Sequence, residues 1–263
     1  MHPVKFRDPF DPTSQPLYTV VLIPARFHST RLPGKPLADI AGSPMIEHVY
    51  RHAATANGVD AVAVATDDKR IVAAVAAFGG VARLTKTSHQ SGTDRIAELA
   101  AEIPCEIVIN LQADEPTTEP ETISNLAQEI SKDPAIKMAT VRRPITDQSD
   151  YANPNVVKVV INCNGDALYF SRSPIPFASN AAHSATVFQH IGLYAYRRSF
   201  LLNYANLKPS PLELAESLEQ LRALENGVRI KTIETSAESI GVDTPESLEQ
   251  ARQILSLNSR VKT

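Results

Sequence analysis

The feature that most constrains this chain is a short apolar run that ends in a basic loop rich in proline and glycine. Residues 20–36 read VVLIPARFHSTRLPGKP, and three cations, Arg26, Arg31 and Lys35, follow the apolar residues. A buried strand that leads into such a loop can hold phosphates at the carboxyl end of a parallel sheet. The pattern therefore predicts a triphosphate-binding loop, although a solvated basic loop would have the same spacing.

The bulk composition indicates a soluble globular enzyme. The chain has 263 residues, of which 43% are hydrophobic and 21% are charged, so it can bury the core of one large domain. Its net charge of −3 gives no field that would attract nucleic acid or an anionic membrane. Cys105 and Cys163 form neither a metal motif nor a disulfide framework. No apolar run approaches the roughly 18 residues of a membrane span. We therefore expect a cytoplasmic protein, with a poorly ordered arm at residues 1–18.

Strand-like and helix-like segments alternate through the first half of the chain. Besides the first apolar run, the expected strands are 61–65, 81–85 and 106–111, and the expected helices are 45–57, 69–78, 93–103 and 120–131. Such alternation with short connections predicts a three-layer α/β fold with a mostly parallel sheet.

The pattern changes after about residue 137. Residues 138–145, 156–161, 167–171 and 188–196 are strand-like, and 162–166 is a hairpin turn signal. We expect one domain, 19–263, with a β-rich insertion at about 138–196 that covers the open sheet edge or forms a dimer contact. Helices are expected again at 199–205, at 211–225 with a capping box from Ser210, and after Thr244, and a further strand at 229–234.

Polar residues follow three of the expected strands. They are the three cations after the first strand, Asp67 and Asp68 after the second, and Gln112 and Asp114 after the fourth. In a doubly wound sheet these ends share one crevice, and cations beside a carboxylate there suggest a nucleoside triphosphate held with Mg²⁺. The alternatives are structural: a turn aspartate at 114, an N-cap pair at 67 and 68, N-caps at Ser91 or Thr93, and a helix cap at Asp243. Neither GxGxxG nor GxxxxGK[ST] occurs.

An ordered set of motifs resembles one enzyme family. It reads PARFHSTRLPGKPL, VATDD, HQSGTDRIAE, NLQADEP, NPNVVKVV, ALYFSRSPIP, QHIGLYAYR, SPLELAESLEQLR and GVDTPESLE. Over about 19–257 the chain resembles the 3-deoxy-manno-octulosonate cytidylyltransferases, also called CMP-Kdo synthetases. The resemblance implies a nucleotide-sugar transferase (Rossmann-like) fold in a homodimer. It also implies the reaction of CTP with Kdo to give CMP-Kdo and pyrophosphate, with Mg²⁺, for lipopolysaccharide biosynthesis.

The resemblance also implies roles for individual residues. Arg26, Arg31 and Lys35 would hold the CTP phosphates, with Lys35 facing the transferred phosphoryl group, and Asp114 and Asp243 would bind Mg²⁺. The residues implied for the nucleotide or the sugar are Gln90, Ser91, Gly92, Gln112, Arg172, His190, Tyr194, Glu219 and Gln220.

One residue departs from the family pattern, which has Gly where this chain has Ala113. A positive φ at that position would strain the turn before Asp114. Three other readings stay open: a related acceptor such as an amino-Kdo, a nucleotide sensor without turnover, and a metal-dependent glycosyltransferase. The last class would normally carry a DxD pair, whereas Asp114 is followed here by Glu115 and Pro116.

Overall fold

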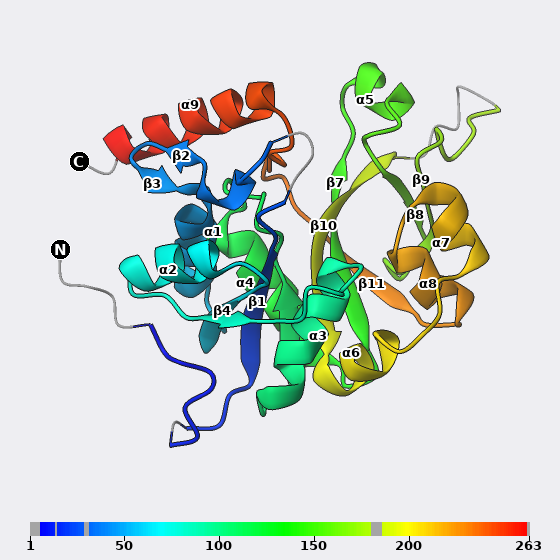
Figure 1. Cartoon of the computed structure of the whole chain (residues 1–263). Helices are drawn as coiled ribbons and strands as arrows, with labels where there is room; N and C mark the ends of the chain where they lie inside the picture. The colour runs from blue at the N-terminus through cyan, green and yellow to red at the C-terminus, as the bar shows by residue number, and fades with distance from the viewer. Residues whose placement is uncertain (1–5, 14, 29–31, 180–185, 262–263) are drawn as a thin grey trace.

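The computed structural model describes residues 6–13, 15–28, 32–179 and 186–261. Four parallel strands form half of its sheet: β1 (Thr19–Ala25), β4 (Ala61–Thr66), β5 (Ala82–Leu84) and β6 (Ile107–Asn110). The strand order is β11-β7-β10-β6-β1-β4-β5, so β1 lies inside the sheet (Figure 1). Every residue of β1 is buried, as a strand covered on both faces requires. The mostly parallel α/β sheet expected from the sequence is confirmed.

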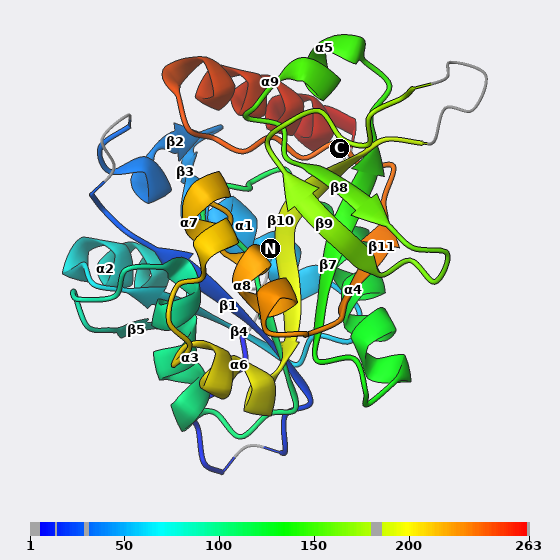
Figure 2. The ribbon, with the colours of Figure 1, turned by 90° about the vertical axis from the view of Figure 1, so that its right-hand side faces the viewer.

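The other half of the sheet comes from the later part of the chain. β10 (Phe188–Arg197) is antiparallel to both β6 and β7 (Met138–Pro144), and β11 (Ile230–Glu234) is parallel to β7. β7 and β10 therefore lie inside the sheet, which corrects the expectation that they cover its edge. β8 (Lys158–Ile161) and β9 (Ala167–Ser171) form the expected hairpin, which branches from β10 (Figure 2).

Helices cover both faces of the sheet, and the alternation of side chains along the strands sorts the core into two layers. α1 (Met45–Thr55), α2 (Lys69–Ala77) and α4 (Pro120–Lys132) pack on the face that receives Val21 and Ile23. α3 (Gly92–Glu102) and α6 (Arg198–Tyr204) pack on the face that receives Val20 and Leu22. The result is the three-layer architecture predicted above.

Several shorter elements differ from the expected pattern. The prediction of a single helix at 211–225 is wrong. The chain forms α7 (Pro211–Glu216) and α8 (Gln220–Glu225), and the backbone of Ser217 between them is in the left-handed region. The sequence also gave no sign of α5 (Gln148–Ala152) or of the small pair β2 (Asp39–Ile40) and β3 (Ser43–Pro44). A 3₁₀ turn, η1 (Lys35–Leu37), precedes that pair.

The last helix, α9 (Pro245–Val261), packs beside β2 and β3 (Figure 1). Val242, Leu248 and Ala251 join Ile40 and Met45 in a third apolar cluster. This cluster matters for the site, because it fixes the segment before α9 next to the segment that follows β1.

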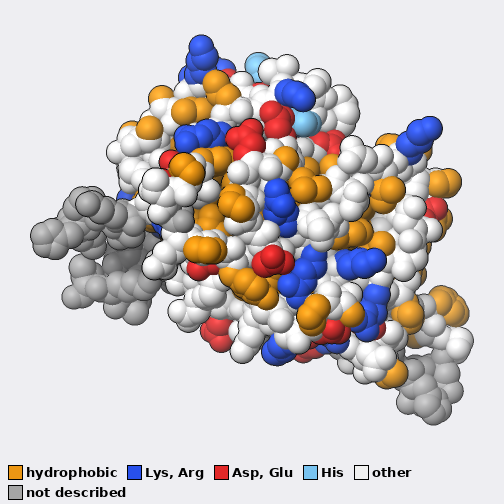
Figure 3. All heavy atoms as spheres, turned by 90° about the horizontal axis from the view of Figure 1, so that it is seen from below, with side chains coloured by type: hydrophobic (Ala, Val, Ile, Leu, Met, Phe, Trp, Pro, Cys, Tyr) orange, Lys and Arg blue, Asp and Glu red, His pale blue; other side chains and the backbone are white. Residues whose placement is uncertain are grey.

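The described part of the N-terminal arm packs on the domain. Phe6 contacts Tyr50 edge-on at 4.8 Å between ring centroids, and Arg83 lies over the ring of Phe10. Seen from below, basic, acidic and apolar side chains are interspersed on the surface (Figure 3). No helix in the described part of the chain is both long and apolar enough to cross a bilayer.

Truncation of Leu22 tests the importance of the central strand. Leu22 is fully buried in β1, so Leu22→Ala should lower the free energy of unfolding by about 2–5 kcal/mol through lost burial and the cavity left behind. Leu84 lies in the edge strand β5 and is 50% exposed, so Leu84→Ala is the matched control and should change stability by less than about 0.5 kcal/mol. Urea unfolding measures both, and equal losses would contradict this account of the core.

Candidate active site

The candidate site lies at a reversal of the strand order. From β1 the chain continues to β4 and β5 on one side, and then returns to β6 on the other side of β1. The carboxyl ends of β1 and β6 flank this switch point, where open α/β sheets bind their ligands. The basic loop follows β1, and Gln112 and Asp114 follow β6.

Lys35 links Asp114 and Asp243, the two aspartates for which the family resemblance implies metal binding. Its Nζ lies 2.6 Å from Asp114 Oδ2 and 2.8 Å from Asp243 Oδ1, and its side chain is 14% exposed. Gly34 fixes the start of η1 with a φ of +69°, and a Cβ at that position would lie 3.1 Å from the ring of Phe27. Glycine is therefore required immediately before Lys35.

Backbone contacts hold the two aspartates together as well. The Val242 N–H donates to the Asp114 carbonyl at 2.8 Å, which joins the segment before α9 to the loop after β6. Thr244 caps α9, with the Ser247 N–H donating to its Oγ1, as the sequence predicted. The Asp243 carboxylate, one residue before this cap, faces Lys35.

The charges around Lys35 shift two pKa values in a consistent way. Burial disfavours the charged form of Lys35, but the nearby charges and hydrogen bonds of Asp114 and Asp243 outweigh it and raise the pKa of this lysine. Glu115 behaves differently: desolvation, reinforced by the charges of Asp114 and Asp243, raises its pKa to about 7, although the Ser239 hydroxyl donates to it. The site therefore holds a firmly charged cation beside a carboxyl group that resists ionisation.

The substitution at Ala113 does not strain the turn before Asp114. Ala41 and Ser217 are the described non-glycine residues with a positive φ, and Ala113 is not one of them. Its side chain is instead buried in the core layer beneath the sheet. Alanine therefore suits this position, and the departure from the family pattern leaves the placement of Asp114 intact.

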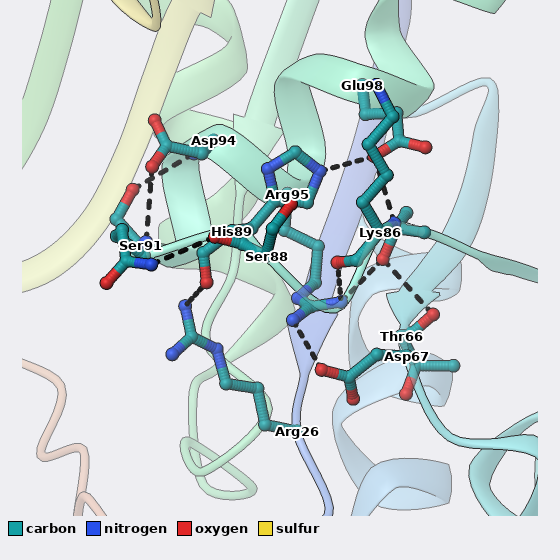
Figure 4. A network of polar contacts seen from close by, with 12 residues as sticks. Arg26, Thr66, Asp67, Lys86, Ser88, His89, Ser91, Asp94, Arg95 and Glu98 are labelled. Carbon is teal, nitrogen blue, oxygen red and sulfur yellow. Dashed lines mark hydrogen bonds and ion pairs between the residues drawn. The ribbon is translucent and has the colours of Figure 1, made fainter.

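Two cations of the basic loop, Arg26 and Lys35, have different partners. Arg26 donates to the His89 carbonyl at 3.2 Å, on the loop before α3 (Figure 4). Lys35 instead faces the two aspartates. Arg31 lies outside the described residues. The predicted loop thus contributes to two sides of the crevice.

A buried ion pair supports the loop that Arg26 contacts. The fully buried Arg95 of α3 lies 2.7 Å from Asp67 and donates to the Thr85 hydroxyl at 2.5 Å (Figure 4). His89 of this loop also forms a hydrogen bond with Glu98 of α3. Asp68 caps α2 as predicted, but the pairing of Asp67 with Arg95 corrects the expectation that both aspartates are N-caps. Arg95 thereby joins the ends of β4 and β5 to α3.

Beside this loop lies a small cavity of about 90 Å³. Gly92, Gln112, Tyr194, Glu219 and Gln220, all predicted to contact substrate, line it together with Thr93, Asn110, Tyr196 and Tyr204. A Cβ at Gly92 would lie 3.1 Å from Pro24, so glycine allows α3 to begin close to β1.

Polar groups inside the cavity lack partners. Gln220 is only 3% exposed; its Oε1 accepts from the Tyr194 hydroxyl at 3.1 Å, but its Nε2 has no hydrogen-bond partner in the described part of the chain. Glu219 Oε1 is likewise unpaired among those residues, and desolvation raises the pKa of this carboxyl. Unpaired buried groups are costly in the absence of a ligand, so they make the cavity a candidate binding site.

The remaining predicted residues lie elsewhere. Gln90 and Ser91 line a neighbouring cleft of about 460 Å³, which Glu219 borders as well, and Ser91 also forms a capping box with Asp94. His190 lies behind Tyr194, hydrogen-bonded to Thr140 at 2.9 Å, and burial lowers its pKa to about 3. Neither His190 nor Arg172 lines the cavity or the cleft. Their roles in binding stay predictions.

Four residues of the cavity were missed from the sequence: Thr93, Asn110, Tyr196 and Tyr204. A signal existed for two of them. Asn110 is a polar residue at the end of the buried strand β6, and Tyr196 follows Tyr194 by two positions in β10, which places both rings on one face. Nothing in the pattern around Tyr204 indicates that α6 turns this ring toward the sheet.

Removal of Arg95 tests the support of the loop before α3. Arg95→Met should lower the free energy of unfolding by about 3–5 kcal/mol, because it leaves the Asp67 carboxylate without its partner. The matched control is Arg229→Met, which breaks the half-exposed pair with Asp133 and should cost less than about 1 kcal/mol. Chemical denaturation of both variants decides the question, and losses of similar size would show that the Arg95 pair adds no more than a surface pair.

Comparison with known proteins agrees with this geometry. The fold and the site at the switch point define a nucleotidyltransferase, and the sequence model of the cytidylyltransferase family matches residues 20–233. A 3-deoxy-manno-octulosonate cytidylyltransferase from Geobacter sulfurreducens is 51% identical over 244 residues, covering 89% of this chain and 98% of the relative. One from Pelobacter propionicus is 50% identical over 242 residues, covering 88% and 95%.

Solved structures lead to the same group. A structure of CMP:2-keto-3-deoxy-manno-octonic acid synthetase complexed with CTP has a TM-score of 0.88 and 49% identity, covering 92% of this chain and 99% of that one. A cytidylyltransferase from Leptospira borgpetersenii, 14% identical with a TM-score of 0.62, shares the fold. The chain belongs to the 3-deoxy-manno-octulosonate cytidylyltransferase family.

Proposed function

We propose that this enzyme transfers CMP from CTP to 3-deoxy-D-manno-octulosonate (Kdo), giving CMP-Kdo and pyrophosphate for lipopolysaccharide biosynthesis. The observation that carries the proposal is the convergence of Asp114 and Asp243 on Lys35 at the switch point of the sheet. The names of the relatives support Kdo as the acceptor and do not favour an amino-Kdo. Neither a sensor nor a glycosyltransferase has support from the relatives.

The cations of the basic loop bind the triphosphate in this proposal. Lys35 carries a charge that the surrounding carboxylates stabilise, so it stays protonated at any physiological pH. Arg26 is exposed beside the loop before α3, where its remaining donors can reach a phosphate or the nucleotide. Arg31 is assigned to the phosphates by its motif alone.

The two aspartates fit a Mg²⁺ site. Both carboxylates approach one nitrogen atom within 3 Å, and their side chains are 30% and 46% exposed, which leaves room for phosphate oxygens and water. Mg²⁺ takes one or two carboxylates together with substrate phosphates, so Asp114 and Asp243 are sufficient protein ligands. Bound there, Mg²⁺ would neutralise phosphate charge and lower the pKa of the attacking hydroxyl.

The cavity suits the hydroxyl-bearing part of the sugar. The residues that line it carry tyrosine and threonine hydroxyls and side-chain amides, and Glu219 is the acidic residue among them. The unpaired Gln220 Nε2 and Glu219 Oε1 would gain partners from sugar hydroxyls. The sugar carboxylate then lies toward the cationic side of the crevice.

The chain's own residues promote the reaction by position and charge. Holding the sugar hydroxyl in line with the α-phosphorus can supply roughly 7–11 kcal/mol of the barrier reduction. Lys35, which is fixed before the reaction begins, can add about 3–4 kcal/mol by facing the charge that develops on the transferred phosphoryl group. We assign no protein general base.

We further propose a cytoplasmic homodimer that pairs through the β8–β9 region. Large apolar side chains are exposed there and on the adjacent α7, with Leu168 60%, Phe177 87% and Leu214 67% exposed. An apolar surface of this kind is typical of a protein interface. Cys105 and Cys163 are both free, which suits a reducing compartment.

Pyrophosphate release tests the proposed function. The enzyme is supplied with CTP, UTP or ATP in combination with a panel of acid sugars that includes Kdo and an amino-Kdo. We expect rapid release only with CTP and Kdo. A clear preference for another nucleotide or another sugar would refute the proposed substrate pair.

Replacement of Lys35 tests its role at the transferred phosphoryl group. Lys35→Ala should lower kcat by about 10²–10³, since the cation stabilises charge that appears only in the transition state. Lys69→Ala, which removes an exposed lysine of α2, is the control and should leave kcat unchanged. A rise in KM at unchanged kcat in Lys35→Ala would instead show that this lysine only binds the ground state.

A further inference from the structure

The break between α7 and α8 is a feature that the proposed function does not explain by itself. Ser217 has a φ of +52°, which residues with a side chain rarely adopt. In an unbroken helix the carbonyls of Glu216 and Ser217 would accept from N–H groups four residues later. Here they accept from Arg172 instead: its Nε lies 2.8 Å from the Glu216 carbonyl, and its Nη2 makes a longer contact of 3.5 Å with that of Ser217.

The side chain of Glu216 completes the attachment from the other direction. Its two carboxylate oxygens accept from the Ser171 hydroxyl at 2.6 Å and from the Arg172 N–H at 2.9 Å. Arg172 thus caps the carboxyl end of α7, and Glu216 forms hydrogen bonds with the end of β9. We call this reciprocal contact of Arg172 and Glu216 the β9–α7 latch.

The latch rests on a rigid base. Lys158, which is fully buried in β8, donates to the Arg172 carbonyl at 2.6 Å and to the carbonyls of Asn153 and Val156. Arg172 Nη1 also donates to the Pro154 carbonyl at 3.0 Å. Both β8–β9 and the segment before β8 therefore hold the arginine in place, and Figure 2 shows this hairpin next to α7 and α8.

The break delivers two side chains to the cavity. Glu219 and Gln220 begin α8 directly after it, and both line the cavity with unpaired polar atoms. The Tyr204 hydroxyl holds the Glu219 carbonyl at 2.6 Å, and the Tyr194 hydroxyl holds Gln220. If α7 continued without the break, each residue would follow the previous one by about 100° around the axis of α7. Glu219 and Gln220 would then point in other directions and would leave the cavity wall.

We propose that Arg172 and Glu216 are positioning residues for the sugar: the β9–α7 latch sets the helix break that holds Glu219 and Gln220 in the cavity. The proposal rests on the proposed function, because it takes the cavity as the sugar site. It differs from direct recognition of the sugar carboxylate by Arg172. Three of the five N–H donors of Arg172 point to carbonyl groups of the chain, and Arg172 lines neither the cavity nor the neighbouring cleft.

Steady-state kinetics on four variants tests the latch. The variants are Arg172→Ala, Glu216→Ala, the double variant, and the control Arg197→Ala. Arg197 caps α4 through the Ile130 carbonyl at 2.6 Å, so it is a helix-capping arginine with no contact to the cavity. KM is measured for Kdo and for CTP, together with the inhibition constant of the C1 carboxamide of Kdo.

Both single variants should raise KM for Kdo about tenfold and leave KM for CTP unchanged, since buried hydrogen bonds to the sugar are lost. The KM for Kdo of the double variant should be no higher than that of the more impaired single variant, because the two residues act as one unit. The preference for the acid over the carboxamide should survive in Arg172→Ala. Loss of that preference, or an unchanged KM in Glu216→Ala, would overturn the proposal.

Hydrogen–deuterium exchange separates the latch from the proposed function. Amides of residues 217–222 should exchange faster in Arg172→Ala than in Arg197→Ala, whether or not the enzyme turns over Kdo. If Arg172→Ala does not fold, Glu216→Gln, which keeps the acceptor for Ser171, should show a smaller increase in the same amides. Unchanged exchange there would refute the latch, whereas an inactive wild-type enzyme would refute the proposed function alone.

Discussion

The structure depends on one cation between two carboxylates. Asp114 and Asp243 are 129 positions apart in the chain, and their like charges would repel each other without Lys35 between them. Three separate elements must be correct for this contact to form: the loop after β1, the loop after β6, and the segment before α9. The apolar cluster around Leu248 and the hydrogen bond from Val242 to Asp114 bring the last of these into place.

Different elements at the strand ends form the walls of the crevice around this centre. The loop before α3, supported by the buried Arg95, forms one wall of the crevice. The cavity lies between that wall and α8, and its tyrosines come from β10 and α6. Because β10 is antiparallel and sits next to β6, Tyr194 lies directly opposite Asn110 in the sheet. The later part of the chain therefore supplies the tyrosines and α8 of the cavity, and the earlier part supplies Gly92, Thr93, Asn110 and Gln112.

Much of this could be predicted from local patterns. Helix starts followed capping chemistry, as at Ser210 and Thr244, and the strands of the first half followed runs of apolar residues. The convergence of Asp114 and Asp243 was expected only through the family resemblance, because spacing alone left capping roles open. The break at Ser217 was not predictable, since the arginine that causes it lies about 45 residues earlier. For the same reason Asp67 was predicted to be an N-cap, because its partner Arg95 is 28 residues away in the sequence.

The central claim is that Asp114 and Asp243 act on one centre, and a double-mutant cycle tests it most directly. The kcat/KM for pyrophosphate release is measured over a range of Mg²⁺ concentrations for Asp114→Asn, Asp243→Asn and the double variant. The account predicts that each single variant is severely impaired and that the double variant is about as active as the worse single variant. Losses that multiply, with an unchanged response to Mg²⁺, would mean that the two carboxylates work independently and would contradict the account.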